Sequence, residues 1–564
     1  MSKVLINLFD KLKLCVSEAI NKAIQNGSLP NESVPAFSIE IPADRSHGDI
    51  ATNAAMVSAK AFRTAPRKIA DLILSNISLP DEMIEKVEIA GPGFINFFVN
   101  KNFYSNVLKE IKDLDEDYGK SNYGENKKVM VEFVSANPTG PMHLGNARGG
   151  ALGDCLASVL QAAGYDVWRE FYINDAGNQI DKFGLSLDVR YKQIWLGEDA
   201  VELPEDSYHG DDIKDLAKQF SDKYGKSFMD VDETERRNAL VNFALPKNIE
   251  RMKYDMERYK IKYDEWFHEK SLHENGEIME VVNELSKRGL TYNSDGAVWY
   301  KATDRGAEKD EVLIRKNGVP TYFVADIAYH RNKFIKRNFD ICIDLWGSDH
   351  HGHVARMKDA MDAIGIDSNR LEILLFQFVR LVQNGEIVRM SKRTGKAIQL
   401  ADLLDEVNSD AARFLFNMRE ANSVMDFDLD LAIKQDSQNP VYYVQYAHAR
   451  ICSIFTSLPE EVLKKYNSSI PDLSLLDKAE EIDLINHLSL YTNEIIQAAK
   501  DLDPTRITRY VISAANLFHK FYNSCRVRCE DENLMNSRLY LCDCVRIVIR
   551  NVLKMFKISV PEKM

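Results

Sequence analysis

Residues 129–150 read VMVEFVSANPTGPMHLGNARGG, and this stretch decides the fold that the sequence predicts. Its first six residues are apolar except for Glu132 and predict a buried strand. A turn rich in Asn, Pro and Gly follows, and a long helix is expected over 144–163, closed by Gly164. Residues 167–173 predict a second strand. This order forms the first half of a dinucleotide-type fold, in which ligands collect at the carboxyl ends of parallel strands.

The start of the expected helix carries residues suited to nucleotide chemistry. A helix N-terminus after a Gly- and Pro-rich turn offers free N–H groups and a positive dipole to phosphate. His143 can donate a hydrogen bond to developing phosphate charge, and Gly145 lets a flat base lie against the backbone. An alternative is a glycine-lined packing face with an incidental histidine, because Gly145, Gly149 and Gly153 are spaced four apart.

A second stretch, RMSKRTGK at 389–396, is a strongly cationic loop. It follows Asn384-Gly385, a hairpin signal between apolar segments at 371–382 and 386–389. Such a loop can fold over polyphosphate and stabilise leaving pyrophosphate. A solvated basic loop is the usual explanation of a charge run. The co-occurrence with the first stretch favours the phosphate interpretation.

Two carboxylates point to a cationic ligand or to internal ion pairs. Glu132 interrupts an apolar strand, where an unpaired carboxylate is costly, so it must meet solvent, a protein cation or a cationic ligand. Asp326 raises the same question, and it shares a face with Tyr322 if the segment after Pro320 is helical. Two carboxylates with this tyrosine and Asn137 suit a planar, five-donor guanidinium. The alternative is an internal salt bridge for each carboxylate.

Three histidines follow another predicted strand, at 339–346. They are His350, His351 and His353 within GSDHHGH. Adjacent histidines point apart on a helix, and no carboxylate has metal-site spacing to them. A wall for nucleotide ribose or substrate is therefore favoured over a metal site.

Composition indicates an ordinary multidomain globular protein. The 564 residues are 45% hydrophobic and 28% charged, and 72 Lys and Arg minus 85 Asp and Glu leave a net charge of −13. This acidic balance argues against nonspecific nucleic-acid binding but allows RNA contact through a local basic stripe. No cleavable signal pattern and no membrane-length apolar stretch is recognised, so a soluble cytoplasmic protein is expected.

Eight cysteines are present, and the last four cluster near the C-terminus at Cys525, Cys529, Cys542 and Cys544. Their spacing does not match a usual zinc finger or ribbon. Cys525 and Cys529 also have helical spacing in an apolar-periodic segment. Buried or incidental thiols are therefore favoured, and no structural metal is expected.

The predicted fold class is multidomain α/β, with a Rossmann-type catalytic domain, an N-terminal α+β module and a C-terminal all-α bundle. The expected units are residues 1–112; 125–400, with a charged helical insertion at about 180–316; a connective helical segment at 401–438; and the bundle at 439–564. The bundle interleaves cations with tyrosines, a composition typical of surfaces that stack and hold single-stranded bases. These residues are Arg450, Arg506, Arg509, Arg526, Arg528, Arg546, Tyr442, Tyr443, Tyr446 and Tyr522.

The sequence resembles arginyl-tRNA synthetases, a family of class I aminoacyl-tRNA synthetases. HLGN at 143–146 resembles the HIGH motif of that class, and RMSKR at 389–393 resembles KMSKS. HGDIATN at 47–53 and GPGFINF at 91–97 look like the family's additional N-terminal domain, which contacts the tRNA elbow. YINDAGNQ at 172–179 is family-like. The C-terminal helices and the end VPEKM resemble its anticodon-binding domain.

The resemblance implies roles for particular residues. The arginine-binding positions are Glu132, Asn137, Tyr322 and Asp326, with His350 near another. The ATP-binding positions are His143, Gly145, Asn146, Met390, Ser391 and Lys392; of these, His143, Asn146 and Lys392 are implied to be catalytic. Asn146 replaces the second histidine of HIGH, and an amide still donates a hydrogen bond but with a smaller charge effect. Arg389 and Arg393 replace the first Lys and last Ser of KMSKS and keep or add positive charge.

The implied reaction joins L-arginine to tRNA(Arg) through an arginyl-adenylate, and in this family the first step also needs bound tRNA. Magnesium is expected with ATP rather than in a protein cage, and a monomer is expected. One alternative is another class I enzyme, but a cysteine enzyme would need a zinc thiolate site, and a leucine or valine enzyme a larger editing insertion. The other is a catalytically silent tRNA-binding paralogue, against which His143 and Lys392 both argue.

Overall fold

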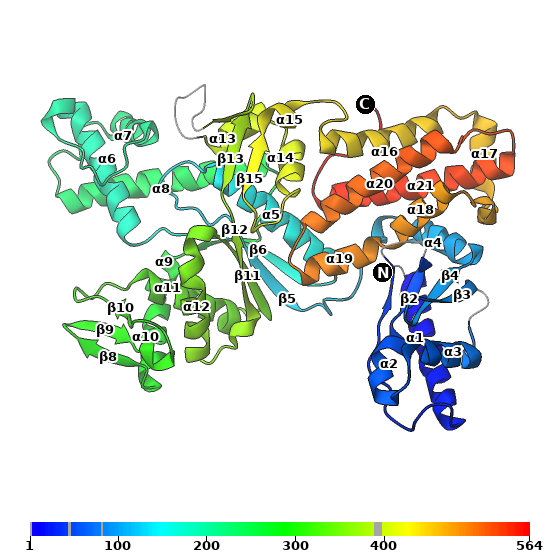
Figure 1. Cartoon of the computed structure of the whole chain (residues 1–564). Helices are drawn as coiled ribbons and strands as arrows, with labels where there is room; N and C mark the ends of the chain where they lie inside the picture. Colours follow the sequence, from blue (N-terminus) through cyan, green and yellow to red (C-terminus); the bar gives the residue numbers. More distant parts are fainter. Residues whose placement is uncertain (1–2, 43–46, 80–82, 389–397) are drawn as a thin grey trace.

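The computed structural model describes residues 3–42, 47–79, 83–388 and 398–564. A five-stranded parallel sheet, ordered β12-β11-β5-β6-β7, organises the middle of the chain (Figure 1). Its strands are β12 (Leu371–Phe376), β11 (Ile341–Gly347), β5 (Lys128–Glu132), β6 (Asp166–Ile173) and β7 (Glu265–His268). Because every neighbouring pair is parallel, all carboxyl ends lie along one edge. The multidomain α/β class predicted from sequence is confirmed.

Helix α5 (Leu144–Ala162) packs on this sheet by its glycine face. A Cβ added to Gly153 would come within 2.3 Å of the Phe133 ring, and one at Gly149 within 3.1 Å of Phe376. A Cβ added to Gly145 would meet nothing within 4 Å. The two interpretations of the glycine row therefore apply to different ends of the helix. Gly149 and Gly153 allow close packing, whereas Gly145 faces open space beside the helix start.

The sequence predicts a helical insertion at about 180–316, but after Arg258 this range contains strands as well as helices. Helices α6 (Asn178–Leu196), α7 (Asp211–Tyr224) and α8 (Glu233–Arg258) form a unit with its own apolar core. The chain then returns to the central sheet as β7. A small antiparallel sheet, α9–α11 and a π-helical turn follow: α9 (Lys270–Glu274), α10 (Glu277–Lys287), β8 (Thr291–Ser294), β9 (Ala297–Tyr300), β10 (Glu311–Ile314), α11 (Tyr322–Arg331) and η5 (Asn332–Lys336).

The apolar segment 371–382 contains parts of two strands that belong to different sheets. After η6 (Ser348–His350), α12 (His351–Ala363) and β12, the chain enters a separate sheet at β13 (Val379–Gln383). Strands β13 and β14 (Glu386–Val388) form the predicted hairpin, and Asn384 and Gly385 have φ angles of 52° and 76°. Strand β15 (Met425–Asp428) pairs with β13 in parallel.

The N-terminal unit is an antiparallel sheet, ordered β1-β2-β4-β3, covered by helices (Figure 1). Its elements are α1 (Lys3–Gln25), β1 (Ile39–Glu40), β2 (Ile50–Thr52), α2 (Ala54–Phe62), α3 (Pro66–Asn76), β3 (Ile84–Ala90), β4 (Phe94–Val99) and α4 (Lys101–Leu114). Helix α1 buries Leu5, Leu8, Leu12 and Val16, which are spaced three or four residues apart, as its amphipathic pattern predicts.

Helices dominate the C-terminal part. They are α13 (Leu400–Glu406), α14 (Ser409–Phe416), α15 (Leu429–Ile433), α16 (Pro440–Thr456), α17 (Glu460–Ser468), α18 (Ala479–Ser489), α19 (Tyr491–Lys500), α20 (Thr505–Ser524) and α21 (Glu532–Met555). Their core is continuous with that of α1, α4 and α5. Helix α20 ends before Cys525, so the helical spacing inferred for Cys525 and Cys529 is wrong. Among the described helices, none combines the length and apolarity that a membrane crossing requires.

Candidate active site

The backbone turns sharply where β5 ends at Glu132. Val134 and Ser135 have φ angles of 74° and 42°, a left-handed conformation that a β-branched valine rarely adopts. The turn lets Ser135 Oγ donate a hydrogen bond to Glu132 Oε1 at 2.8 Å and accept one from Tyr172 N at 3.2 Å. Such strain persists where surrounding contacts hold it, and it clusters at binding sites. The carboxyl end of β5 is therefore the starting point of the site.

Glu132 has a buried protein counter-ion. Lys333 Nζ, in the π-helical turn η5, donates to Glu132 Oε2 at 2.6 Å and to Asp344 Oδ1 at 2.8 Å. Asp344 is the register partner of Glu132 on β11, so two like charges lie side by side with the ammonium between them. Burial raises the pKa of Glu132. Burial acts in the same direction on Asp344, but Lys333 and His330 outweigh it and lower the pKa of Asp344 to about 2.

His330 completes this buried charge cluster. Its Nδ1 lies 2.7 Å from the carbonyl oxygen of Asp326, and its Nε2 lies 2.7 Å from Asp344 Oδ2. His330 therefore bridges the backbone of α11 and the carboxylate of Asp344. Lys333 is shared by the two carboxylates, and His330 contacts one of them. Of the three possibilities that the sequence left for Glu132, the structure gives the protein cation.

Helix α11 places Tyr322 and Asp326 on one face, as the sequence predicts for a helix after Pro320. His353 Nε2 lies 3.0 Å from Asp326 Oδ2, and the carboxylate-bearing side chain is 33% exposed. Tyr322 is 39% exposed, and a Cβ added to Gly177 would lie 3.6 Å from its hydroxyl. The backbone of the 172–179 segment therefore passes beside Tyr322. The Asp326 carboxylate therefore remains partly accessible to solvent on this side of the site.

The start of α5 forms the second wall. His143 is the N-cap residue and is exposed, and Asn146 Oδ1 accepts a hydrogen bond from His143 N at 2.9 Å. The Asn146 amide oxygen is thereby used in capping the helix, which leaves its NH₂ group to donate outward. His143 also forms an isolated antiparallel bridge with Gln399, and Leu400 N donates to Met142 O at 2.8 Å.

The cationic stretch lies outside the described residues, and so do Met390, Ser391 and Lys392. The chain on both sides of it is described. Strand β14 ends at Val388, and Gln399 lies beside His143. Lys392 is seven residues from Gln399 (399 − 392), and seven extended residues span at most about 24 Å. Gln399, which follows the cationic stretch in sequence, thus lies next to the HLGN motif at the N-terminus of α5.

His350 and His353 both lie beside Trp346 but have different polar partners. His350 ends the short helix η6 with a side chain that is 61% exposed, and it contacts Trp346 at a ring distance of 6.3 Å. His353 is the one that reaches Asp326. Asn137 lies exposed in the turn after β5, where Asn248 Nδ2 supports the neighbouring Pro138 O at 2.9 Å. Within the described ranges, no group of three or more His, Cys, Asp or Glu could hold a metal ion.

Sequence reasoning missed several residues of this site. Glu269, just after β7, is 3% exposed and accepts a hydrogen bond from Tyr172 OH at 2.8 Å. Burial, with Glu269, Asp326 and Glu132 nearby, raises the pKa of Tyr172 far above its usual value. Glu269 lies in a charged segment where one more carboxylate gives no signal. Lys333 likewise lies in a cation-rich stretch, residues 330–337, and only its contacts with Glu132 and Asp344 distinguish it.

Some of the arginines and tyrosines predicted to hold bases lie together between α16 and α20, and others do not. Arg450 lies 4.4 Å from the Tyr522 ring centroid and 5.8 Å from that of Tyr446, and His519 packs against Tyr446 and Tyr443. This α16–α20 cluster keeps Tyr446 partly exposed. The remaining cations of the predicted set are largely engaged in protein contacts: Arg506 with Glu494 and Asp501, Arg509 with Glu420 and Asp503, Arg546 with Asp543, and Arg528 with Ser457.

Comparison with known proteins defines the class first. Residues 108–453 match the family model described as "tRNA synthetases class I (R), catalytic domain". Residues 10–99 match "Arginyl tRNA synthetase N terminal domain", and residues 444–564 match "DALR anticodon binding domain". A nucleotide-type sheet with the HLGN turn at its carboxyl edge therefore belongs to a class I aminoacyl-tRNA synthetase.

Whole-chain relatives then give the family. The arginine–tRNA ligase of Acetivibrio thermocellus is 55% identical over 564 residues, and that of Caldanaerobacter subterraneus is 56% identical over 564 residues; each alignment covers 100% of both chains. Thermus thermophilus arginyl-tRNA synthetase has the same fold, with a TM-score of 0.73 at 20% identity over 98% of this chain and 100% of that one. The chain belongs to the arginyl-tRNA synthetase family.

Proposed function

We infer that this protein attaches L-arginine to its cognate tRNA in two steps, with ATP as the energy source. The arginine carboxylate attacks the α-phosphate of ATP, which gives arginyl-adenylate and pyrophosphate. A terminal ribose hydroxyl of the tRNA then attacks the activated carbonyl and releases AMP. Neither step needs a nucleophile from the protein, so positioning and charge stabilisation carry the rate.

The observation that carries the substrate assignment is the partly open carboxylate of Asp326 beside the buried charge cluster. A guanidinium presents five donors in one plane, and a carboxylate and a tyrosine hydroxyl suit that geometry. We assign the counter-charge of the guanidinium mainly to Asp326, and Tyr322 lies on the same face of α11. The charge of Glu132 is compensated by Lys333. We therefore assign to Glu132 the role of a fixed hydrogen-bond acceptor in the wall of the site. Asn137 and His350 are proposed contacts for the rest of the amino acid.

The observation that carries the ATP assignment is the start of α5. Its free N–H groups and dipole suit phosphate, the open space at Gly145 suits adenine, and His143 with the Asn146 NH₂ can donate to phosphate oxygens. Met390, Ser391 and Lys392 are proposed to complete this site over the pyrophosphate. Gln399, which follows the cationic stretch in sequence, lies beside His143, and this supports the assignment.

Magnesium is proposed to arrive with ATP, held mainly by the phosphates. The N-terminal unit is proposed to contact the tRNA elbow, and the α16–α20 cluster of Arg450, Tyr446 and Tyr522 to hold anticodon bases. We also propose a cytoplasmic monomer. All eight cysteines are free thiols, which supports a reducing compartment.

ATP–pyrophosphate exchange tests the function directly. The purified chain should catalyse exchange with arginine but with no other standard amino acid, and only when tRNA(Arg) is present. Charging of total tRNA with each amino acid in turn should give arginyl-tRNA alone. Exchange with another amino acid would mean a different class I specificity, and no exchange or charging at all would mean a silent tRNA-binding paralogue.

A further inference from the structure

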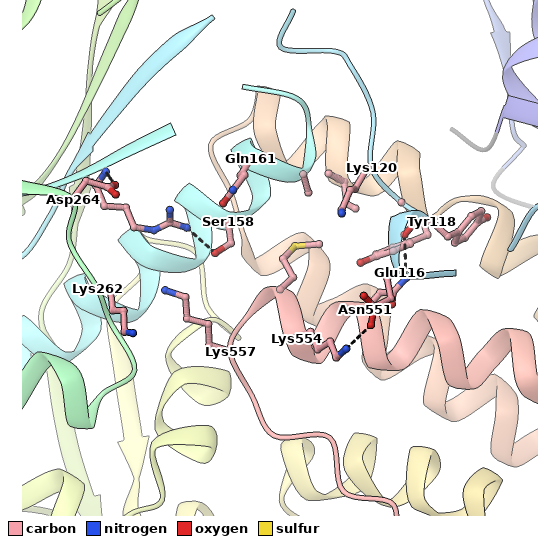
Figure 2. A pocket seen from close by; sticks show the side chains of 16 residues that line it. Glu116, Tyr118, Lys120, Ser158, Gln161, Lys262, Asp264, Asn551, Lys554 and Lys557 are labelled. Carbon is pink, nitrogen blue, oxygen red and sulfur yellow. Dashed lines mark hydrogen bonds and ion pairs between the residues drawn. The ribbon is translucent and has the colours of Figure 1, made fainter. Parts of the chain in front are cut away.

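A second cavity lies at the far end of α5 from His143. It has a volume of about 680 Å³ and is lined by the last turns of α5, the start of β6, the loop before β7, the linker after α4, and the helices α19 and α21 (Figure 2). Ser158 is fifteen residues from His143 (158 − 143), so the helix axis separates the two sites by roughly 22 Å. The cavity is therefore distinct from the candidate active site.

The lining is positive in a chain that is acidic overall. Five cations line the cavity, from four separate parts of the chain: Lys120, Arg169, Lys262, Lys554 and Lys557. Two carboxylates, Glu116 and Asp264, face them. The lining thus carries a net charge of +3 (5 − 2), whereas the whole chain carries −13. A concave surface with one sign of charge concentrates ions of the opposite sign.

A buried carboxylate behind the cavity wall does not balance its neighbours. Asp154 Oδ1 accepts hydrogen bonds from Lys557 Nζ at 2.7 Å and Arg169 Nε at 3.0 Å, and its Oδ2 accepts one from Arg413 Nη2 at 2.5 Å. Three cations therefore share one carboxylate. Burial lowers the pKa of Lys557, and although Asp154 raises it, Arg169 and Arg413 lower it further. Uncompensated positive charge in a partly buried place favours the arrival of an anion.

Lys262 adds to this excess from the loop before β7. It has no hydrogen bond or ion pair with any residue in the described parts of the chain. Figure 2 shows Lys262 and Lys557 on one side of the cavity and Lys120 and Lys554 on the other. Lys120 and Lys554 already have carboxylate partners, Asp117 and Glu116, at 2.6 Å and 2.7 Å. The unbalanced charge is therefore concentrated on the Lys262 side.

We propose that this cavity binds a phosphate group, carried either by a small phosphorylated metabolite or by the backbone of bound tRNA. The Lys557 ammonium and the Arg169 guanidinium supply charged donors, and Lys262 supplies a third. The volume is within the range of pockets that hold nucleotide-sized ligands. Because the lining comes from the linker, the catalytic domain and the bundle, a bound phosphate would stabilise their mutual arrangement.

Inorganic phosphate is the first probe, added to the full chain with the active site saturated by a non-hydrolysable arginyl-adenylate analogue. The melting temperature should rise with the logarithm of phosphate concentration. Lys262→Ala should remove most of that rise, because it takes away the unpaired cation without breaking an ion pair. Lys287→Ala, which removes an exposed lysine of α10, should keep it. The proposal is overturned if phosphate raises the melting temperature equally in all three proteins. It is also overturned if phosphate does not raise the melting temperature of the wild type and Lys262→Ala leaves the salt dependence of tRNA binding unchanged.

The salt dependence of tRNA binding separates the two sources. If the phosphate belongs to tRNA, the slope of log Kd against log salt should fall by about 1 in Lys262→Ala. If the slope stays unchanged while the phosphate-dependent stabilisation is lost, the ligand is a small phosphorylated molecule. Both results support the site. ATP–pyrophosphate exchange is measured in parallel, so a failure of the proposed aminoacylation function would be seen separately.

Discussion

At the residue scale, charge compensation decides which carboxylates can meet a substrate. Glu132 and Asp344 are held by Lys333 and His330, whereas Asp326 pairs with His353 among the described residues and stays partly exposed. We therefore propose that a guanidinium entering the site finds its counter-charge at Asp326. The carboxylates of the neighbouring cluster already share the Lys333 ammonium, so they shape the wall of the site.

Asp326→Asn should raise the KM for arginine strongly and leave stability nearly unchanged. The change turns a charge-assisted hydrogen bond into a neutral one, with a loss on the order of 2 kcal/mol, or about thirtyfold in KM. Steady-state charging and thermal melting measure the two quantities. Citrulline, which lacks the charge, should be discriminated less by the variant than by the wild type. A large drop in melting temperature with an unchanged KM would assign Asp326 to structure instead.

Lys333→Met should destabilise the protein strongly, because it leaves Glu132 and Asp344 buried side by side without their cation. Breaking a buried ion pair from one side costs about 3–5 kcal/mol. Denaturant unfolding gives the change in free energy. Adding Asp344→Asn to the first change should restore part of the loss, since one of the two like charges is removed. An unchanged unfolding free energy in the single variant would contradict the charge cluster.

Lys392→Ala should reduce the rate of adenylate formation by roughly a hundredfold, a loss of about 3 kcal/mol in transition-state stabilisation. Its loop is polar and follows a hairpin, so the melting temperature should hardly change. Single-turnover adenylate formation in the presence of tRNA measures the step. A normal rate would remove Lys392 from the ATP site.

At the element scale, Arg148 joins helix α5 to the connection between β12 and β13. This guanidinium is fully buried, and it donates to Gln377 O at 2.6 Å and to Glu420 O at 2.9 Å. Burial lowers its pKa to about 10, which leaves it charged at neutral pH. Gln377 lies in the connection between β12 and β13, and β13 leads into the hairpin before the cationic stretch. Arg148 therefore fixes the base of that hairpin against the helix that carries His143.

Arg148→Met should lower the rate of adenylate formation more than it raises the KM for arginine. Two partly buried carbonyl oxygens lose their charged donor, and the β12–β13 connection is freed to shift. We expect about a tenfold fall in kcat at a temperature where the variant remains folded. The kcat of Arg148→Lys, which keeps a cation, should lie between that of the wild type and that of Arg148→Met. Equal kinetics in both variants and the wild type would contradict this role.

At the scale of the whole molecule, Arg413 links the catalytic domain to the bundle. Arg413 of α14 donates to Asp154 on α5, to Tyr259 O at 3.1 Å and to Phe556 O at 2.8 Å after α21. The apolar core also runs without a break from α1 through α5 to α21. Removing residues 439–564 would therefore expose core, so point variants on the bundle surface give a cleaner test of tRNA contact.

Tyr446→Ala should raise the KM for tRNA while leaving the KM for arginine unchanged. Loss of one base–aromatic stacking contact costs about 1–3 kcal/mol, a factor between roughly 5 and 150. Arg450→Met should act in the same direction, since its guanidinium packs on Tyr446 and Tyr522. Tyr224→Ala, an exposed tyrosine of α7, is the matched control. Equal tRNA KM values in the control and in the bundle variants would place the anticodon elsewhere.

Local sequence by itself determined the elements that lead to the site. The apolar run before Glu132, the glycine row of α5 and Asn384-Gly385 specify strand, helix and hairpin through short-range rules, and the structure follows them. The resemblance of HLGN and RMSKR to class I signatures pointed to the family, and the whole-chain relatives confirm it. The face shared by Tyr322 and Asp326 also followed from helical spacing.

Only the tertiary structure decided the partners of the charged residues. Lys333 is 201 positions from Glu132, and Arg413 is 259 positions from Asp154, so neither pairing leaves a local pattern. The return of the chain to the central sheet as β7 is likewise hidden in a charged segment, because an edge strand of four residues gives little periodicity. Sequence names the groups that can ionise. Which of them remain available to a substrate depends on long-range packing, because burial and counter-ions set their charge balance.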